Sequence, residues 1–156
     1  KRDKRTGRES AEAAPPKELY ALMFDIDFFK SINDRFGHPN ADIVLKYFSS
    51  CLRSVFKREN DYVSRYGGEE FVILAWCQNA NDVLVLAENV RKLFSSKVFE
   101  FENVKTGNVE KFSVTVSAGV SKFSESMNEK DLVSLADTAL YMAKNSGRNK
   151  VVYNKI

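Results

Sequence analysis

Two pairs of neighbouring acidic residues stand out because each adjoins an apolar run of strand-like composition. Asp25 and Asp27 follow the run LYALMF, and Glu69 and Glu70 precede FVILAW. If these runs are neighbouring strands, the acids crowd one edge of a sheet, where like charges are costly unless a cation neutralises them. Carboxylate oxygens suit Mg²⁺ that is bound together with substrate phosphates. Acids that merely cap strand ends in water would explain either pair alone.

Gly67 and Gly68 lie directly before the second acidic pair. A tight turn between two strands needs backbone angles that glycine adopts cheaply. Without a Cβ, the same residues let a phosphate or sugar approach the backbone closely, although a hairpin alone explains them equally well. The sequence contains neither GxxxxGK nor GxGxxG, so neither a P-loop enzyme nor a Rossmann dinucleotide-binding protein is supported.

The elements that must position these residues follow from hydrophobic periodicity and end signals. The first half is expected to contain a strand at 19–24 buried on both faces, a helix at 41–56 capped by Asn40, and strands at 62–65 and 70–76. A helix opened by Asn81-Asp82 follows, with Val83, Leu86, Val90 and Leu93 on its buried face. The rest is expected to be an irregular hairpin within 98–111, a half-buried strand at 114–120, a helix at 129–145 stopped by Gly147, and a strand at 151–153. This order predicts an α+β fold with a mainly antiparallel sheet covered by helices.

Composition is typical of one globular domain, with 156 residues, of which 44% are hydrophobic and 29% are charged. We expect a linker or truncated N-terminal segment at 1–18, ending in Pro15-Pro16, and one domain at 19–156. The net charge of +3 is accounted for by residues 1–9, so the body has no electrostatic footprint for nucleic acid. No apolar run reaches the length of a membrane span, and we expect no membrane contact by this domain. Cys51 and Cys77 are expected to be reduced core thiols, which indicates a cytosolic compartment.

Three separated motifs in this order resemble the GGDEF family of diguanylate cyclases. They are FDIDFFKSINDRFGHPNAD from Phe24, RYGGEEF from Arg65 and ADTALYMAKNSGRN from Ala136, and the similarity covers about 19–156. The resemblance implies a fold similar to the palm of polymerases and to nucleotidyl cyclases, a ferredoxin-like arrangement. It also implies an enzyme of the bacterial cytosol that condenses two GTP into cyclic di-GMP and pyrophosphate.

By this resemblance, the catalytic residues are Asp25, Glu69 and Glu70, with Glu70 assisting in the site or in activating the 3′-hydroxyl. Two Mg²⁺ or Mn²⁺ ions per active site are expected on Asp25, Glu69 and the backbone carbonyl of Ile26. Asp27 is a weaker candidate ligand, because it shares a face with Asp25 only if the strand stays regular.

The same resemblance assigns the GTP-binding residues. Backbone amides at Phe28 and Phe29, whose side chains we expect in the core, and the ammonium of Lys30 would hold phosphates. Asn33 and Asp42 would read guanine, and Lys144 with Arg148 would bind the triphosphate. The remaining positions of the expected substrate site are Gly67 and Gly68. Ala41 stands where the family usually has Gly, and the single histidine, His38, is expected to shape the loop.

Arg58 and Asp61 form an RxxD sequence five residues ahead of Gly67. Many family members carry a product-binding inhibitory site at this offset, and arginine can bind guanine or phosphate in a bidentate way. The resemblance therefore implies non-competitive feedback inhibition by cyclic di-GMP. An ordinary charged loop is the alternative interpretation.

The family's usual DxLTGLxNR-like stretch is absent from this chain, so we expect a fragment that lacks an upstream sensor or receiver domain, which in the full-length protein is compatible with a membrane anchor. Catalysis would require a homodimer, because each domain presents one GTP to the other. Two alternatives stay open: a non-catalytic cyclic di-GMP receptor acting through Arg58 and Asp61, and a related nucleotidyltransferase with another product.

Overall fold

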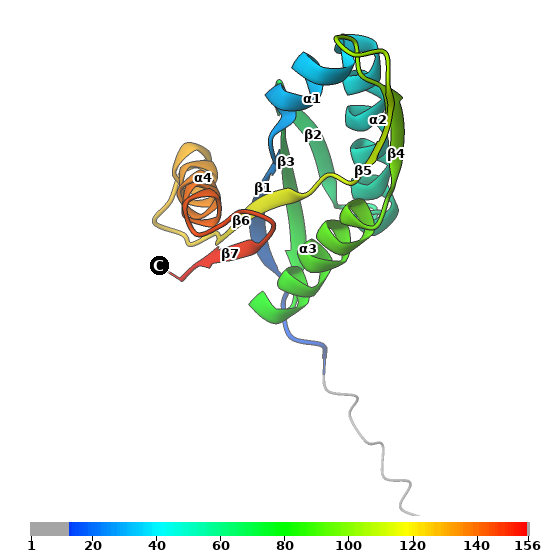
Figure 1. Ribbon diagram of the computed structural model, residues 1–156. Helices are drawn as coiled ribbons and strands as arrows, with labels where there is room; N and C mark the ends of the chain where they lie inside the picture. The colour runs from blue at the N-terminus through cyan, green and yellow to red at the C-terminus, as the bar shows by residue number, and fades with distance from the viewer. Residues whose placement is uncertain (1–12, 156) are drawn as a thin grey trace, which may run out of the picture.

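A computed structural model describes residues 13–155 as a five-stranded sheet between two layers of helices (Figure 1). The strand order is β2-β3-β1-β6-β7, and every neighbouring pair is antiparallel except β6 and β7. The strands are β1 (Glu18–Ile26), β2 (Tyr62–Gly67), β3 (Glu70–Cys77), β6 (Val116–Lys122) and β7 (Val151–Asn154), and the separate hairpin consists of β4 (Phe99–Glu102) and β5 (Val109–Phe112). The mainly antiparallel α+β prediction is confirmed.

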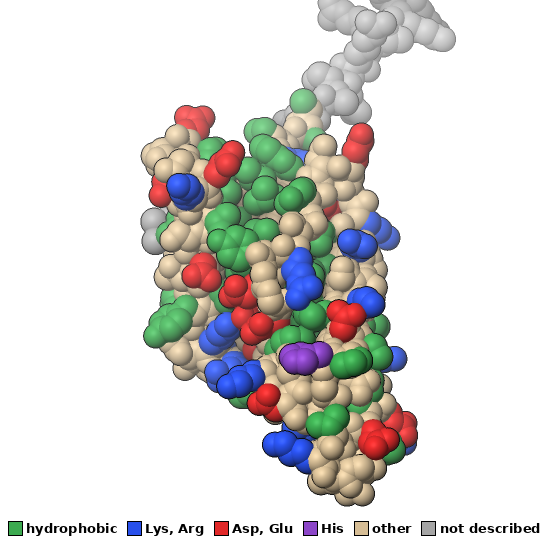
Figure 2. Space-filling view, turned by 90° about the horizontal axis from the view of Figure 1, so that it is seen from above, with side chains coloured by type: hydrophobic (Ala, Val, Ile, Leu, Met, Phe, Trp, Pro, Cys, Tyr) green, Lys and Arg blue, Asp and Glu red, His purple; other side chains and the backbone are tan. Residues whose placement is uncertain are grey.

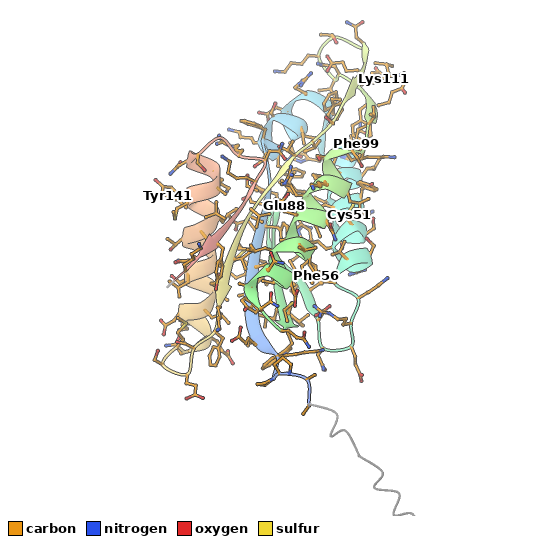
Figure 3. All side chains as sticks on the ribbon, turned by 90° about the horizontal axis from the view of Figure 1, so that it is seen from below. Cys51, Phe56, Glu88, Phe99, Lys111 and Tyr141 are labelled. Atoms are coloured by element: carbon orange, nitrogen blue, oxygen red, sulfur yellow. The ribbon has the colours of Figure 1, made fainter. Side chains whose placement is uncertain are left out.

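The helices are α1 (Phe29–Phe36), α2 (His38–Val55), α3 (Ala80–Ser95) and α4 (Glu129–Asn145). Helices α1, α2 and α3 cover one face of the sheet, and α4 covers the other (Figure 1). Tyr141 lies on the outer side of α4, where it is exposed (Figure 3). Within residues 13–155, no helix combines the length and apolar composition that crossing a bilayer requires.

Strand β1 is central because its two faces belong to different cores. Leu22 and Phe24 pack with α2 and α3, whereas Ala21 and Met23 pack with Leu132 and other residues of α4. This alternation follows from the period of two in a strand, and it explains the uninterrupted apolar run in the sequence. The prediction of a strand buried on both faces is confirmed, and the strand continues two residues further, to Ile26.

Strand β6 is also buried on both faces, so the prediction of a half-buried strand was wrong. Its polar residues lie inside because their hydroxyls are hydrogen-bonded. Ser121 Oγ donates to the Leu132 carbonyl over 2.7 Å, and Ser117 Oγ donates to Asp27 Oδ1 over 2.7 Å. Small side chains also let α4 approach. A Cβ on Gly119 would come within 2.0 Å of the Ala136 carbonyl oxygen.

Three details of the helices correct the sequence prediction. Helix α1 was not anticipated. Helix α2 begins at His38 after Gly37, so Asn40 is not its cap; the amide of Asn40 donates to the Phe36 carbonyl instead. Helix α3 is capped by Asn79, whose side chain accepts from the Asp82 N–H over 3.0 Å.

Helix α3 buries Val83, Ala87, Val90 and Phe94, and Leu86 packs partly buried against the same core, so the predicted face is wrong only for exposed Leu93. Leu93 and Phe94 both fit the helical spacing after Val90. Phe94 is the residue that packs inside, against Phe48, with 4.8 Å between the ring centroids. The hairpin within 98–111 and the helix at 129–145 are confirmed. The expected linker falls mainly on residues 1–12, which lie outside the described residues, and the domain boundary stays a prediction.

The close approach of α4 to β6 gives a test of the fold. We expect Gly119→Ala to destabilise the domain by about 3 kcal/mol or more, because the added methyl would overlap the backbone of α4. Urea denaturation followed by circular dichroism measures this change. Gly67→Ala is the matched control for folding, since a Cβ there meets nothing within 4 Å. Equal stability of the two variants would contradict the packing described here.

Candidate active site

The two acidic segments meet at one end of the sheet, beside α1 (Figure 1). In the β1–β3 register Asp25 lies opposite Glu70, and the Ile26 N–H donates to the Glu69 carbonyl over 3.4 Å. Because Asp25 shares its face with Ala21 and Met23, it faces α4. Figure 2 views this end of the molecule and shows acidic side chains beside basic ones, near the single histidine.

Asp25 is buried, with 5% of its surface exposed. Lys144, at the last turn of α4, donates from Nζ to Asp25 Oδ2 over 2.7 Å. Burial raises the pKa of Asp25 to about 6; the Lys144 ammonium pulls the pKa down, and the Glu69 and Glu70 carboxylates push it up. Ionised Asp25 is therefore short of compensating positive charge.

The oxygen donors at this end of the sheet fit a hard divalent cation. Asp25 and Glu69 offer carboxylates, and Ile26 offers a backbone carbonyl next to the Glu69 backbone. Within the described part of the chain, no three Asp, Glu, His or Cys side chains gather closely enough to hold a metal by themselves. Mg²⁺ usually takes one or two carboxylates and completes its shell with water and substrate phosphates, so the Asp25 and Glu69 carboxylates suit it.

The β2–β3 turn leaves the backbone open beside the acids. Gly68 has φ of +53°, and a Cβ at Gly67 or Gly68 would meet nothing within 4 Å. Arg65 donates from Nε to the Gly68 carbonyl over 2.7 Å and so braces the turn. The hairpin prediction is confirmed, and the space above it can admit part of a ligand.

The segment after β1 turns sharply into α1. Phe28 adopts a left-handed conformation with φ of 56° and is 66% exposed, so the expectation of a core side chain was wrong for Phe28 and right for buried Phe29. The first turn of α1 has neither a side-chain cap nor an acidic residue, which leaves its N–H groups suited to an anion. Lys30 is exposed there, and the Arg148 guanidinium lies 4.7 Å from the centroid of the Phe28 ring.

The two expected guanine readers lie on different helices, Asn33 on α1 and Asp42 on α2. Asp42 forms an exposed ion pair with Lys46 over 2.9 Å and lines a cavity of about 290 Å³. The cavity also contains Arg65, so it borders the glycine turn. His38 is exposed at the start of α2, and Ala41 is buried within the helix.

Arg58 and Asp61 lie at the opposite end of the sheet, near the start of β1. Arg58 Nε donates to Asp61 Oδ2 over 3.1 Å, and Arg58 Nη2 lies 3.4 Å from Cys77 Sγ. The Asp61 side chain is buried by this contact, whereas that of Arg58 is 42% exposed. Both residues line a cavity of about 390 Å³ together with Lys17, Glu59, Asn60 and Trp76.

The structure brings most of the expected catalytic and phosphate-binding residues together, with Asn33 and Asp42 on the adjoining helices. It turns Asp27 away from a ligand role, because the Asp27 oxygens accept hydrogen bonds from Thr115 and Ser117. Arg65, which stands within RYGGEEF, was not predicted to have a role. The ion pair between Lys144 and Asp25 joins residues 119 apart, and no local pattern could reveal it.

Comparison with known proteins agrees with this geometry. The family model described as "Diguanylate cyclase, GGDEF domain" matches residues 3–150. The chain belongs to the GGDEF family. It is 39% identical to diguanylate cyclase A of Treponema denticola over 138 residues. The aligned region covers 88% of this chain and 35% of that protein. The chain thus spans about a third of the length of this relative.

Solved GGDEF structures confirm the palm-like fold. The GGDEF domain of DgcB from Caulobacter crescentus, in complex with c-di-GMP, superposes with a TM-score of 0.79 at 31% identity, covering 88% of this chain and 78% of that one. The active GGEEF domain of a diguanylate cyclase from Vibrio cholerae has a TM-score of 0.75 at 30% identity, covering 90% and 85%.

The raised pKa of Asp25 predicts a pH-dependent effect of removing its charge. Ionisation of Asp25 opposes folding of the metal-free protein; this cost is absent below pH 3.8, grows as the pH approaches 6 and is complete above that. We therefore expect Asp25→Asn to stabilise the domain in EDTA at pH 7.5, by at most about 3 kcal/mol, and to have little effect at pH 3.5. Urea titrations at both pH values measure it.

Glu125→Gln, at an exposed acid, is the matched control and should leave the free energy of unfolding nearly unchanged. A loss of stability in Asp25→Asn at pH 7.5 would contradict the prediction, because the pair with Lys144 would then outweigh the cost of burying the Asp25 charge.

Proposed function

We propose that this chain is the catalytic domain of a diguanylate cyclase, which condenses two GTP into cyclic di-GMP and two pyrophosphates. The observation that carries the proposal is the β1–β3 register. It places Asp25 opposite Glu70, and the Ile26 N–H donates to the Glu69 carbonyl beside an open glycine turn. Membership of the GGDEF family supports it. The domain would work as a homodimer in which each copy presents one GTP to the other.

The reaction takes two condensation steps. Each forms a bond between the ribose 3′-oxygen of one GTP and the α-phosphorus of the other and breaks the bond to the leaving pyrophosphate, and the second step closes the ring. Divalent cations, two Mg²⁺ or Mn²⁺ held by Asp25, Glu69 and the Ile26 carbonyl, would neutralise phosphate charge and make the 3′-hydroxyl more acidic. Glu70 lies in register with Asp25 and would assist in accepting the proton of that hydroxyl.

The remaining residues would bind and orient the substrate. N–H groups at the start of α1, together with Lys30 and Arg148, would hold the β- and γ-phosphates. Lys144 would contribute to the triphosphate while balancing the charge of Asp25. Asp42 would accept from the N1–H and N2–H edge of guanine, and Asn33 would complement it.

The direct test is product formation from GTP by the purified domain. After removal of co-purified nucleotide, we expect cyclic di-GMP from GTP and Mg²⁺, identified by mass spectrometry. Glu69→Ala should lower kcat by at least about a hundredfold, because it removes a carboxylate from the charge-neutralising site. Glu125→Ala is the control at an exposed acid.

Each other outcome supports a different assignment. A product other than cyclic di-GMP would indicate a related nucleotidyltransferase. No turnover, even after forced dimerisation, together with tight cyclic di-GMP binding would indicate a receptor domain. The Arg58–Trp76 cavity is the observation that favours the receptor as the second candidate.

We also propose that cyclic di-GMP binds at Arg58 and Asp61 and inhibits the enzyme non-competitively. The cavity combines a half-exposed guanidinium with Trp76, which offers an aromatic face for a purine. Seven residue steps along β1, roughly 20 Å, separate this end of the sheet from Asp25. A ligand here would therefore not overlap a GTP in the active site.

Arg58→Ala tests this second site. We expect at least a roughly tenfold weaker affinity for cyclic di-GMP and a matching loss of product inhibition, because the bidentate donor is gone, with KM for GTP unchanged. Calorimetry and initial rates with added product measure the two effects. Lys57→Ala is the neighbouring exposed control. Product inhibition that survives Arg58→Ala would exclude this site.

A further inference from the structure

Asp27 is a buried carboxylate that the proposed chemistry does not use. It is 3% exposed, and none of the ion pairs among residues 13–155 involves it. Its oxygens accept three hydrogen bonds, from Thr115 Oγ1 over 2.7 Å, from Ser117 Oγ over 2.7 Å and from the Asn149 N–H over 3.1 Å. These donors stabilise the buried carboxyl group, since burial without hydrogen-bond partners would be costly.

The backbone around Asp27 is unusual. In the described part of the chain, the non-glycine residues with positive φ are Phe28, Arg148 and Asn149, at 56°, 61° and 48°. All three adjoin Asp27: Phe28 follows it in sequence, and Asn149 donates to it directly after Arg148. Left-handed backbone is unfavourable for side chains with a Cβ, so it persists only where surrounding contacts hold it.

The Asn149 contact determines where Arg148 lies. Gly147, with φ of 111°, ends α4 and starts the turn, and the Arg148 N–H donates to the Ala143 carbonyl over 3.0 Å. On the other side, Asn149 is fixed by Asp27 Oδ2, with Ser117 Oγ as a second acceptor at 3.2 Å. Between these two fixed points, the Arg148 guanidinium lies over the Phe28 ring.

We propose that Asp27 is a positioning residue for Arg148. Thr115, just before β6, and Ser117, on β6, orient the Asp27 carboxylate. The carboxylate holds the left-handed turn at Asn149 and so keeps the Arg148 guanidinium beside the amides of α1. There it is placed for the polyphosphate of a nucleotide. The inference rests on the proposed function, because it assigns Arg148 to that phosphate; Asp27 itself touches no substrate and acts through Arg148.

The test compares nucleotide affinity in four variants. The probe is 3′-deoxy-GTP with Mg²⁺, which lacks the attacking hydroxyl, and calorimetry gives Kd. We expect Asp27→Ala and Arg148→Ala each to weaken binding by about tenfold, and the double variant to bind within about twofold of Arg148→Ala alone, because both changes remove one contact. Thr115→Val is the matched control: it deletes a bond to the same oxygen, leaves Asn149 in place and should keep Kd within about twofold.

Two further readouts separate positioning from general loss of structure. In steady-state assays, Asp27→Ala should raise KM by a larger factor than it lowers kcat. In the nucleotide-free protein, the Asn149 amide should exchange with solvent at least about tenfold faster in Asp27→Ala than in Thr115→Val. If Asp27→Ala does not fold, Asp27→Ser replaces it, because its single hydroxyl is polar yet too short to reach the donors that meet Asp27 Oδ2, including the Asn149 N–H.

The outcomes distinguish this inference from the proposed function. Unchanged affinity in Arg148→Ala would contradict the phosphate role of Arg148 and with it that part of the function. Weaker binding in Arg148→Ala with wild-type binding in the Asp27 variant would overturn the inference alone. Additive losses in the double variant would also overturn it, because Asp27 would then act by another route.

Discussion

The structure depends on the burial of β1 on both faces. A strand covered by α2 and α3 on one side and by α4 on the other cannot slip by one residue, because a slip would exchange the side chains of two different cores. The register with β3 is therefore fixed, and it fixes Asp25 opposite Glu70. Apolar packing of Ala21 and Met23 thus determines the position of Asp25, two residues after Met23, and of Glu70 opposite it.

This packing has an electrostatic cost at the end of β1. The alternation that faces Met23 toward α4 also buries Asp25, whose raised pKa reports that its charge is poorly compensated. Lys144 compensates only in part, and it comes from the end of the helix that packs on the same face. A site that would be more stable without its acid is typical of functional groups, since stability alone would favour an amide there.

The sequence predicted those parts of the fold and site that rest on local patterns. The two-sided burial of 19–24, the glycine hairpin and the helix at 129–145 each have a distinct pattern, and the acids were correctly expected to share an edge. Helix α1 was missed because eight residues hold too few turns for a periodic signal. The half-buried prediction for β6 failed because Ser117 was expected to face outward, whereas its hydroxyl is hydrogen-bonded inside the protein. Similarly, Phe28 counted as core because sequence does not reveal a left-handed backbone.

The two ends of β1 and β3 impose a constraint on how product could regulate such a domain. The Arg58 cavity and the acidic end share these paired strands, and a closely packed sheet of fixed register has low compressibility and deforms little. A ligand at Arg58 would therefore leave the geometry of Asp25 and Glu70 nearly unchanged. Since each domain would contribute only one GTP, inhibition needs no such change: it is enough to hold two domains in an arrangement in which their acidic ends do not meet. Rigidity of the sheet thus favours control of domain placement over control of the site itself.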